Sequence, residues 1–157
     1  MREGNILTEE TLIAKKQDSS LKLFVVLAKA YRAIMEQAEM DIKSKGLNLT
    51  DFAVLELLFH RGKQPLQKIG DKILMTSGSI TYIVNKLEKK GYLIREASPD
   101  DGRVTYARIS NQGRELLSTI FPTHWDNIKM IMNGLSDEEK ETAIELLKKL
   151  GTTIKKI

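Results

Sequence analysis

A pair of apolar stripes at helical spacing, separated by a short break, is the feature that most restricts how this 157-residue chain can fold. The first stripe follows Pro65, which is tolerated at a helix start, and comprises Leu66, Ile69 and Ile73. The second has the i, i+3, i+4, i+7 spacing of one helix face, at Ile80, Ile83, Val84 and Leu87. A short helix, a tight turn and a second helix with an inward aliphatic stripe indicate a helix-turn-helix.

The segments on either side of this pair extend the pattern. Before it, Thr50 is expected to cap a helix whose apolar residues nearly encircle it, so this helix should be central and buried. After it, two β-prone runs, YLIREAS and RVTYARIS, flank a PDDG turn at residues 99–102. They predict a hairpin, although the imperfect alternation leaves its register open. We therefore predict a mainly α fold with a small β-hairpin, a winged helix-turn-helix.

Amphipathic helices are expected at both ends of the chain. One covers residues 20–45, Ser110 should cap another that Pro122 kinks or interrupts, and a capping box at residues 136–139 opens the last. Their apolar faces favour pairing with a second subunit, and packing on their own wing domain is the alternative. The expected parts are a polar, frayed arm over 1–18, a dimerisation helix over 19–46, the winged helix-turn-helix domain over 47–110 and dimerisation helices over 111–157.

Positive charge is concentrated in the middle of the chain. Residues 61–114 carry 11 Lys and Arg against 5 Asp and Glu, and the other residues carry 14 against 16. The net charges of +6 and −2 sum to the +4 of the whole chain. This distribution predicts that the middle segment meets a polyanion such as DNA, and a merely solvated basic surface is the alternative.

What the sequence lacks disfavours several classes of protein. It has no cysteine for a disulfide or a thiol switch, no apolar run long enough to span a membrane and no secretory signal, so we expect a cytoplasmic protein without a membrane partner. The two histidines, His60 and His124, have no metal-ligand spacing, and no metal or cofactor is expected. An enzyme is not expected either, because no phosphate loop or nucleophile motif is present.

Three segments, in order along the chain, resemble one family. They are LTDFAVLELL, then IGDKILMTSGSITYIVNKLEKKGYLIREASPDDGR, then ISNQGREL. This order of a helix-turn-helix, LEKKG, an acidic-Gly-Arg wing turn and a Ser-x-x-Gly helix start is similar to that of the MarR family of bacterial transcriptional regulators. The resemblance implies a triangular dimer with an effector pocket between its dimerisation and DNA-binding parts. Without cysteine, the family's thiol-oxidation response is not expected in this chain.

The outward face of the second helix of the pair is the predicted base reader. A helix fits the major groove of B-DNA, and its N-terminal residues reach base edges. Hydroxyl groups there can bind bases or phosphates, a lysine one turn further on suits a phosphate, and a glycine permits close backbone approach. The alternative is an ordinary polar face. The candidates are Ser77, Gly78, Ser79, Thr81, Tyr82 and Lys86.

Arginines of the hairpin form the second part of the predicted DNA-binding surface. Arg103 directly follows the PDDG turn, where the resemblance places the family's wing arginine, and a guanidinium suits a narrow minor groove. Asp101 is expected to hold an arginine in place, and the alternative is that it only forms the turn. Arg95 and Arg108 either touch phosphates or pair with nearby carboxylates.

A small-molecule effector is also expected. The candidate pocket residues are Phe24, Tyr31, Trp125 and Met132, for which plain core or dimer seam is the alternative. The predicted function is a homodimeric regulator that binds a pseudo-palindromic operator in double-stranded DNA, acting as a repressor released by an aromatic or phenolic effector. The alternative is a winged-helix dimer used for protein contacts without DNA reading.

Overall fold

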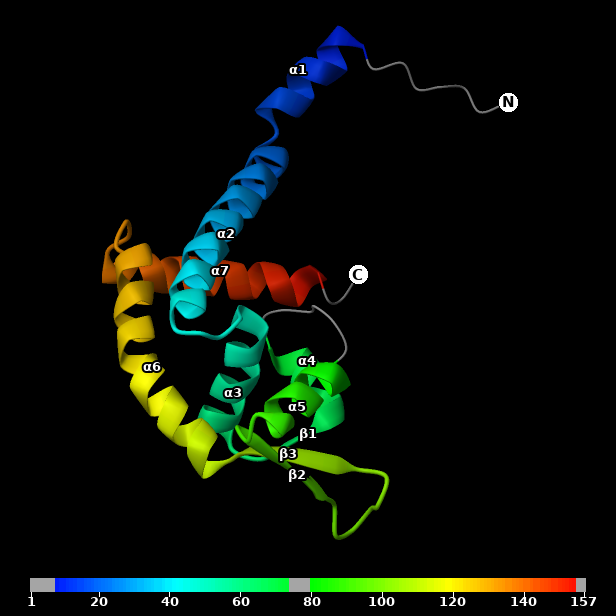
Figure 1. The fold of residues 1–157 in the computed structure, drawn as a ribbon. Coiled ribbons are helices and arrows are strands. Elements are labelled where there is room, and N and C mark those ends of the chain that lie inside the picture. The colour runs from blue at the N-terminus through cyan, green and yellow to red at the C-terminus, as the bar shows by residue number, and fades with distance from the viewer. Residues whose placement is uncertain (1–7, 74–79, 155–157) are drawn as a thin grey trace. The chain divides into compact units, whose positions relative to one another are not determined.

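The computed structural model describes residues 8–73 and 80–154, which form seven helices and three short strands (Figure 1). The helices are α1 (Glu9–Gln17), α2 (Ser19–Ser44), α3 (Leu49–Arg61), α4 (Leu66–Lys72), α5 (Ile80–Lys89), α6 (Asn111–Ile131) and α7 (Asp137–Ile154). The strands are β1 (Gln64–Pro65), β2 (Leu93–Ala97) and β3 (Thr105–Ile109). The chain divides within α2 into two compact units, one up to residue 37 and one from residue 38 onward.

The first unit contains α1 and the first part of α2. The Thr8 hydroxyl caps α1 by accepting a hydrogen bond from a backbone N–H of its first turn. Glu9 and Glu10 lie in that first turn, and Lys15 and Lys16 lie in the last. Acids near the N-terminus and bases near the C-terminus complement the helix dipole. Residues 9–17 of the arm expected to be frayed are therefore helical, and their Thr8 cap was not predicted. Residues 1–7 lie outside the described residues.

The second unit contains the winged helix-turn-helix, built around α3. This helix is central and buried as predicted, with Phe52, Leu55 and Leu58 almost fully inaccessible to solvent. Its cap is Asn48 rather than Thr50, because the Asn48 side chain accepts a hydrogen bond from the third residue of the helix at 2.7 Å. Around α3 the core comprises Ile42, Leu47, Val54, Ile69, Ile73, Ile83, Val84, Leu87, Leu93, Ala107, Ile109, Leu117 and Ile120.

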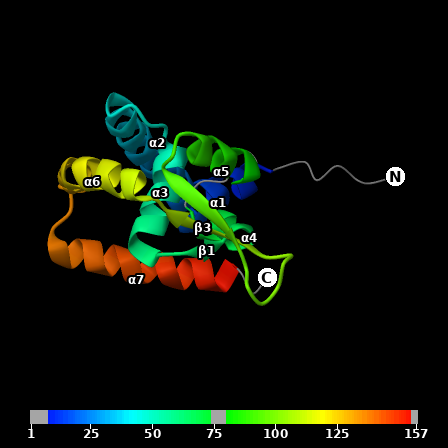
Figure 2. The same ribbon diagram turned by 60° about the horizontal axis from the view of Figure 1, so that its bottom comes forward.

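The predicted hairpin forms and belongs to a three-stranded antiparallel sheet with the order β1-β3-β2. Leu93 lies opposite Ile109, which fixes the register that the sequence left open. Strand β1 pairs with the other edge of β3 and was not predicted, since two residues carry no periodicity. Pro65 ends β1 and is the cap residue of α4, immediately before the helix it was expected to start. The turn between β2 and β3 extends beyond the helices (Figures 1 and 2).

The boundaries of α6 and α7 follow local sequence signals. Ser110 caps α6 as predicted, with its hydroxyl accepting from the backbone N–H of Gly113 at 3.0 Å. Helix α6 then continues through Pro122, so of the two outcomes expected there, a kink or an interruption, the interruption is wrong. The predicted capping box opens α7, because the backbone N–H of Glu139 donates to the Ser136 hydroxyl at 3.2 Å and that of Ser136 donates to the Glu139 carboxylate at 2.8 Å.

Two helices keep large apolar side chains exposed in a single chain. On α2 these are Leu21, Leu23, Phe24, Val25, Val26 and Tyr31, and on α7 they are Ile144, Leu146, Leu147, Leu150 and Ile154. Helix α7 has no buried residue at all. Over residues 8–73 and 80–154, none of the helices has the length and apolar character needed to cross a membrane.

Candidate nucleic-acid interface

Helix α5 presents a polar face to solvent and an aliphatic face to the core. Ile83, Val84 and Leu87 are buried, as the stripe predicted, and hold the helix against α3 and the sheet. The side chains of Thr81, Tyr82, Asn85 and Lys89 are exposed on the other side. Of the predicted base readers, Thr81 and Tyr82 therefore lie on an accessible face. Ser77, Gly78 and Ser79 lie outside the described residues.

Lys86, predicted to contact phosphate, has a carboxylate partner inside the protein. Its ammonium lies 2.6 Å from Oδ1 of Asp51, in the first turn of α3. The Asp51 side chain is only 2% exposed, whereas that of Lys86 is 27% exposed. Asp51 was not predicted as part of the site, because its partner Lys86 lies on another helix.

The wing turn fixes the position of Arg103 while leaving its side chain accessible. Oδ1 of Asp101 accepts hydrogen bonds from the backbone N–H of Arg103 at 3.0 Å and from its Nε at 3.2 Å. The Arg103 side chain is nevertheless 92% exposed. Asp101 thus combines the two alternatives weighed for it, because it shapes the turn and also holds an arginine. The turn closes with a backbone bond from Ser98 to Val104.

The strand arginines Arg95 and Arg108 both pair with carboxylates. Arg95 contacts Glu88 of α5 at 2.5 Å, and Arg108 pairs with Glu96 on the neighbouring strand. The hydrogen bond from Arg95 lowers the pKa of Glu88, and the one from Arg108 lowers the pKa of Glu96. Both pairs are partly exposed, so each contributes little to stability. The pair of Arg95 and Glu88 links the wing to α5.

The start of α6 anchors the base of the wing. The Ser110 hydroxyl donates to the carbonyl of Gly91 at 2.5 Å, and the backbone N–H of Ser110 donates to the carbonyl of Tyr92 at 3.0 Å. Gly113 lies so close that a Cβ added there would be 2.1 Å from the Tyr92 carbonyl oxygen. Gly91 itself has φ +77°, which allows α5 to end at Lys89 and β2 to begin at Leu93. Helix α5, the wing and α6 therefore contact one another through the backbone at Gly91 and Tyr92 and through Ser110.

A second buried polar cluster joins the end of α2 to the middle of α6. Nδ1 of His124 lies 2.7 Å from Oδ2 of Asp41, and Lys45 pairs with the other carboxylate oxygen. The ring of Phe52 packs edge-on against His124. Burial of Asp41 opposes its ionisation, but the hydrogen bonds with Lys45 and His124 outweigh burial and lower its pKa. No role was predicted for His124, because its partner is 83 residues away in the sequence.

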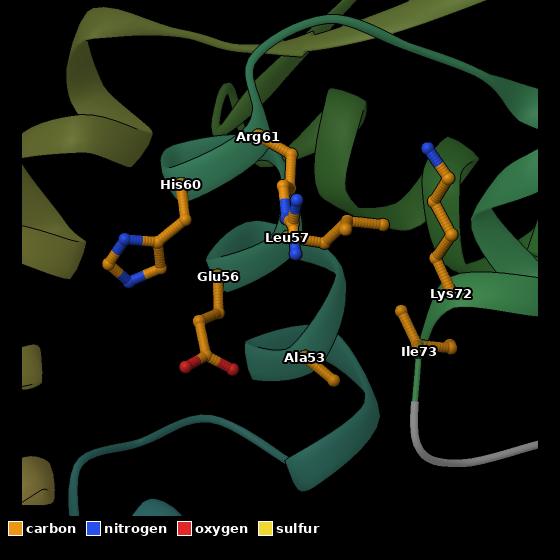
Figure 3. A pocket seen from close by; sticks show the side chains of 7 residues that line it. All are labelled: Ala53, Glu56, Leu57, His60, Arg61, Lys72 and Ile73. Atoms are coloured by element: carbon orange, nitrogen blue, oxygen red, sulfur yellow. The ribbon is translucent and has the colours of Figure 1, made fainter.

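A small pocket of about 190 Å³ lies between α3 and the end of α4 (Figure 3). Leu57 points toward Lys72 and Ile73, whereas Glu56 and His60 point to the other side of α3 (Figure 3). The Lys72 ammonium donates to the Gln64 side chain at 2.5 Å. The pocket thus combines apolar walls with two cationic side chains, those of Arg61 and Lys72, and one carboxylate, that of Glu56. Its lining residues are Ala53, Glu56, Leu57, His60, Arg61, Lys72 and Ile73.

The residues predicted for an effector pocket do not line this one. Phe24 and Tyr31 are exposed in the first unit. Trp125 and Met132 belong to α6 and its C-cap in the second, where Trp125 is exposed and its ring lies beneath the Lys129 ammonium. Among the described residues, no group of three or more His, Asp or Glu side chains is arranged to hold a metal ion.

Comparison with known proteins gives consistent matches. The family model of the MarR family matches residues 47–105. HTH-type transcriptional regulator MhqR of Bacillus subtilis is 55% identical over 88% of this chain and 95% of its own length. Two solved structures share the fold. Sco3205 of Streptomyces coelicolor, a MarR family regulator in complex with DNA, has a TM-score of 0.75 at 19% identity, covering 96% of this chain and 91% of its own. Bordetella bronchiseptica BpsR, whose DNA binding is regulated by 6-hydroxynicotinic acid, has a TM-score of 0.73 at 20% identity, covering 83% and 98%.

Proposed function

This chain belongs to the MarR family and is a helix-turn-helix DNA-binding transcriptional regulator, and from that premise we propose that it is a dimeric repressor which a small aromatic effector releases from its operator. The observation that carries the DNA-binding part is the wing. Asp101 restrains the backbone of an arginine whose side chain is almost fully exposed. Next to the wing, α5 presents Thr81 and Tyr82 to solvent.

The two parts of this surface suit different grooves. Helix α5 enters the major groove, where Thr81 and Tyr82 reach base edges or phosphates. Arg103 enters the adjacent minor groove, where a narrow width strengthens the negative potential that attracts a guanidinium. Arg95 exchanges its contact with Glu88 for a phosphate when DNA is bound.

Dimerisation is supported by the exposed apolar residues of α2 and α7. A single chain leaves these side chains in water, and a second copy would bury them. A two-fold dimer places two recognition helices on half-sites about one helical turn apart, so the operator is a pseudo-palindrome. A dimer of this kind that does not bind DNA would match the alternative left open by the sequence, a winged-helix dimer used for protein contacts.

The Arg103→Ala variant tests the DNA-binding proposal. The reference duplex is one selected from random DNA by the wild-type protein, and a shuffled duplex measures non-specific binding. Loss of the minor-groove contact should weaken operator affinity about 10-fold, or about 1.4 kcal/mol. Lys140→Ala, which removes an equal charge from α7, is the matched control and should bind like the wild type. Selection that enriches no sequence would instead favour the protein-contact alternative.

The pocket in Figure 3 supports an effector that is a single aromatic ring carrying an anionic group. Its volume of about 190 Å³ is close to the ~150 Å³ of an engineered cavity that holds benzene. Leu57 and Ile73 can contact the ring, and Arg61 and Lys72 can pair with a carboxylate or phenolate. Helix α4 is the next helix before α5 in the chain, so a ligand that shifts α4 can move the recognition helix.

Ligand titration tests the effector proposal. The probe is 6-hydroxynicotinic acid, with cyclohexanecarboxylic acid as a non-aromatic control of similar size. The aromatic acid should lower operator affinity of the wild type by 5- to 150-fold at saturation. Arg61→Ala should weaken that response at least 10-fold in ligand concentration, whereas Lys68→Ala, outside the pocket on α4, should not. Equal responses of both variants would exclude this pocket as the effector site.

A further inference from the structure

The contact between Lys86 and Asp51 links the recognition helix to the first turn of α3. Asp51 is the third residue of α3, and its backbone N–H is already bound by the Asn48 cap. The Asp51 side chain extends to α5, where the Lys86 ammonium lies 2.6 Å from Oδ1.

Burial makes this pair different from the ion pairs of the wing. The Asp51 side chain is 2% exposed, whereas the acids that pair with Arg95 and Arg108 are 34% and 37% exposed. Within the described part of the chain, Oδ1 of Asp51 accepts no hydrogen bond, so the Lys86 ammonium is the group that compensates its charge. A buried carboxylate without a cation is strongly unfavourable. Lys86 is thus held toward the protein interior.

The direction of this hold matters because of where Lys86 lies on α5. Lys86 is followed by the buried Leu87, and the buried Ile83 and the exposed Tyr82 lie about one turn before it. Apolar packing is non-directional, so the aliphatic stripe alone tolerates small rotations of α5 about its axis. The short contact between Lys86 of α5 and Asp51 of α3 restricts such rotations. The pair therefore sets which side chains of α5 face outward.

We propose that Asp51 and Lys86 are positioning residues that fix the rotation of the recognition helix, and that Lys86 is not a phosphate contact. This inference rests on the proposed DNA-reading function of α5. A phosphate that drew the Lys86 ammonium away would leave the buried Asp51 carboxylate without its cation. The pair contributes to sequence discrimination and not to general affinity for DNA.

Asp51→Asn gives a test in which the two interpretations predict opposite signs. Asparagine keeps the shape of the side chain, removes a negative charge and frees Lys86. If Lys86 binds phosphate, operator affinity should stay equal or rise. If the pair positions α5, operator affinity should fall at least 5-fold, while affinity for a shuffled duplex stays equal or rises because a negative charge is removed. Asp126→Asn, which removes an exposed acid from α6, is the matched control and should leave the ratio of the two affinities as in the wild type.

Lys86 variants make the test independent of folding defects. Lys86→Met should lower the ratio of operator to shuffled affinity at least 5-fold, and Lys86→Arg should restore most of it. Loss of a phosphate contact would instead weaken both duplexes equally and reduce the salt slope by about 1; that result would overturn the proposal, as would an unchanged ratio. Circular dichroism and thermal unfolding select folded variants. Failure of the proposed DNA-reading function can be distinguished from failure of the Asp51–Lys86 proposal, because in that case the wild type itself would show no preference for any duplex.

Discussion

At the scale of single residues, a few close contacts shape the wing and its base. Gly113 illustrates this, because the absence of its side chain allows α6 to lie against the Tyr92 carbonyl at the base of the wing. Asp101 illustrates it differently, since one oxygen shapes the turn and holds the arginine at the same time. Gly113 thus shapes the base of the wing, and Asp101 shapes its turn.

Replacing Gly113 with alanine should destabilise the protein. A Cβ there would be 2.1 Å from the Tyr92 oxygen and 2.9 Å from the Ile109 side chain, and a backbone carbonyl cannot move aside cheaply. The expected loss is at least the ~1–3 kcal/mol of an overpacked core position. Gly151→Ala, in α7 with nothing within 4 Å, is the control and should stabilise by about 1 kcal/mol. Urea unfolding of the two variants measures the difference, and equal stabilities would contradict the predicted clash.

How well the sequence predicted each residue depended on the distance in sequence to its partner. The Ser110 cap and the Ser136 capping box were predicted because their partners lie three residues away. Asp51 and His124 were not, since their partners lie on other helices and no local pattern indicates them. The DNA-facing roles of Thr81, Tyr82 and Arg103 stay predictions, supported by the exposure of their side chains.

At the scale of elements, polar contacts connect helices and strands that also pack through the aliphatic core. The Asp41 cluster joins the end of α2 to α6, and the start of α6 joins the wing. Helices and the hairpin were predictable because their periodicities and turn residues are local signals. Strand β1 and the continuation of α6 through Pro122 were not, because the pairing with β3 and the surrounding packing override local preference.

The Asp41 cluster should give the stability of the protein a pH dependence. The pKa of Asp41 is lowered in the folded state from its ordinary value of 3.8. Its stabilising effect is therefore fully present above about pH 3.8 and is lost as the pH falls further, through the folded-state pKa. Asp41→Asn should cost about 2 kcal/mol at pH 7, as expected for hydrogen bonds to a charged group.

Urea unfolding of the wild type and of Asp41→Asn, from pH 7 down to pH 3, measures this contribution. The difference between the two proteins should be constant down to about pH 4 and shrink below it. Asp137→Asn, whose acid is fully exposed in α7, serves as the control and should differ little from the wild type at any pH. A difference that stays constant at pH 3 would show that Asp41 does not act through its charge.

At the scale of the whole molecule, each unit carries an apolar surface that a single chain leaves exposed. On α7 the exposed apolar residues recur at helical spacing through Leu147 and Leu150, which is the pattern of a helix that packs against another. The sequence predicted this surface from periodicity alone. It could not predict how two copies are arranged, because that depends on complementarity between surfaces far apart in the chain.

Leu147→Lys should therefore weaken the dimer. A lysine placed within a buried apolar interface loses hydration without a partner, which costs several kcal/mol. Sedimentation velocity at micromolar concentration should show a shift from dimer toward monomer, with reduced operator affinity. Glu145→Lys introduces the same side chain on the opposite face of α7 and should sediment as the wild type does. If both variants remain dimeric, α7 does not belong to the dimer interface.

The wing arginine has a consequence for how operator occupancy is adjusted. In the proposed complex, Arg103 approaches DNA with part of its charge already neutralised by Asp101. The benefit to the complex is therefore smaller than an arginine without an acidic partner would give. Occupancy at a given protein concentration can then be tuned through an acid that never touches DNA, leaving the groove-facing residues, and with them the sequence preference, unchanged.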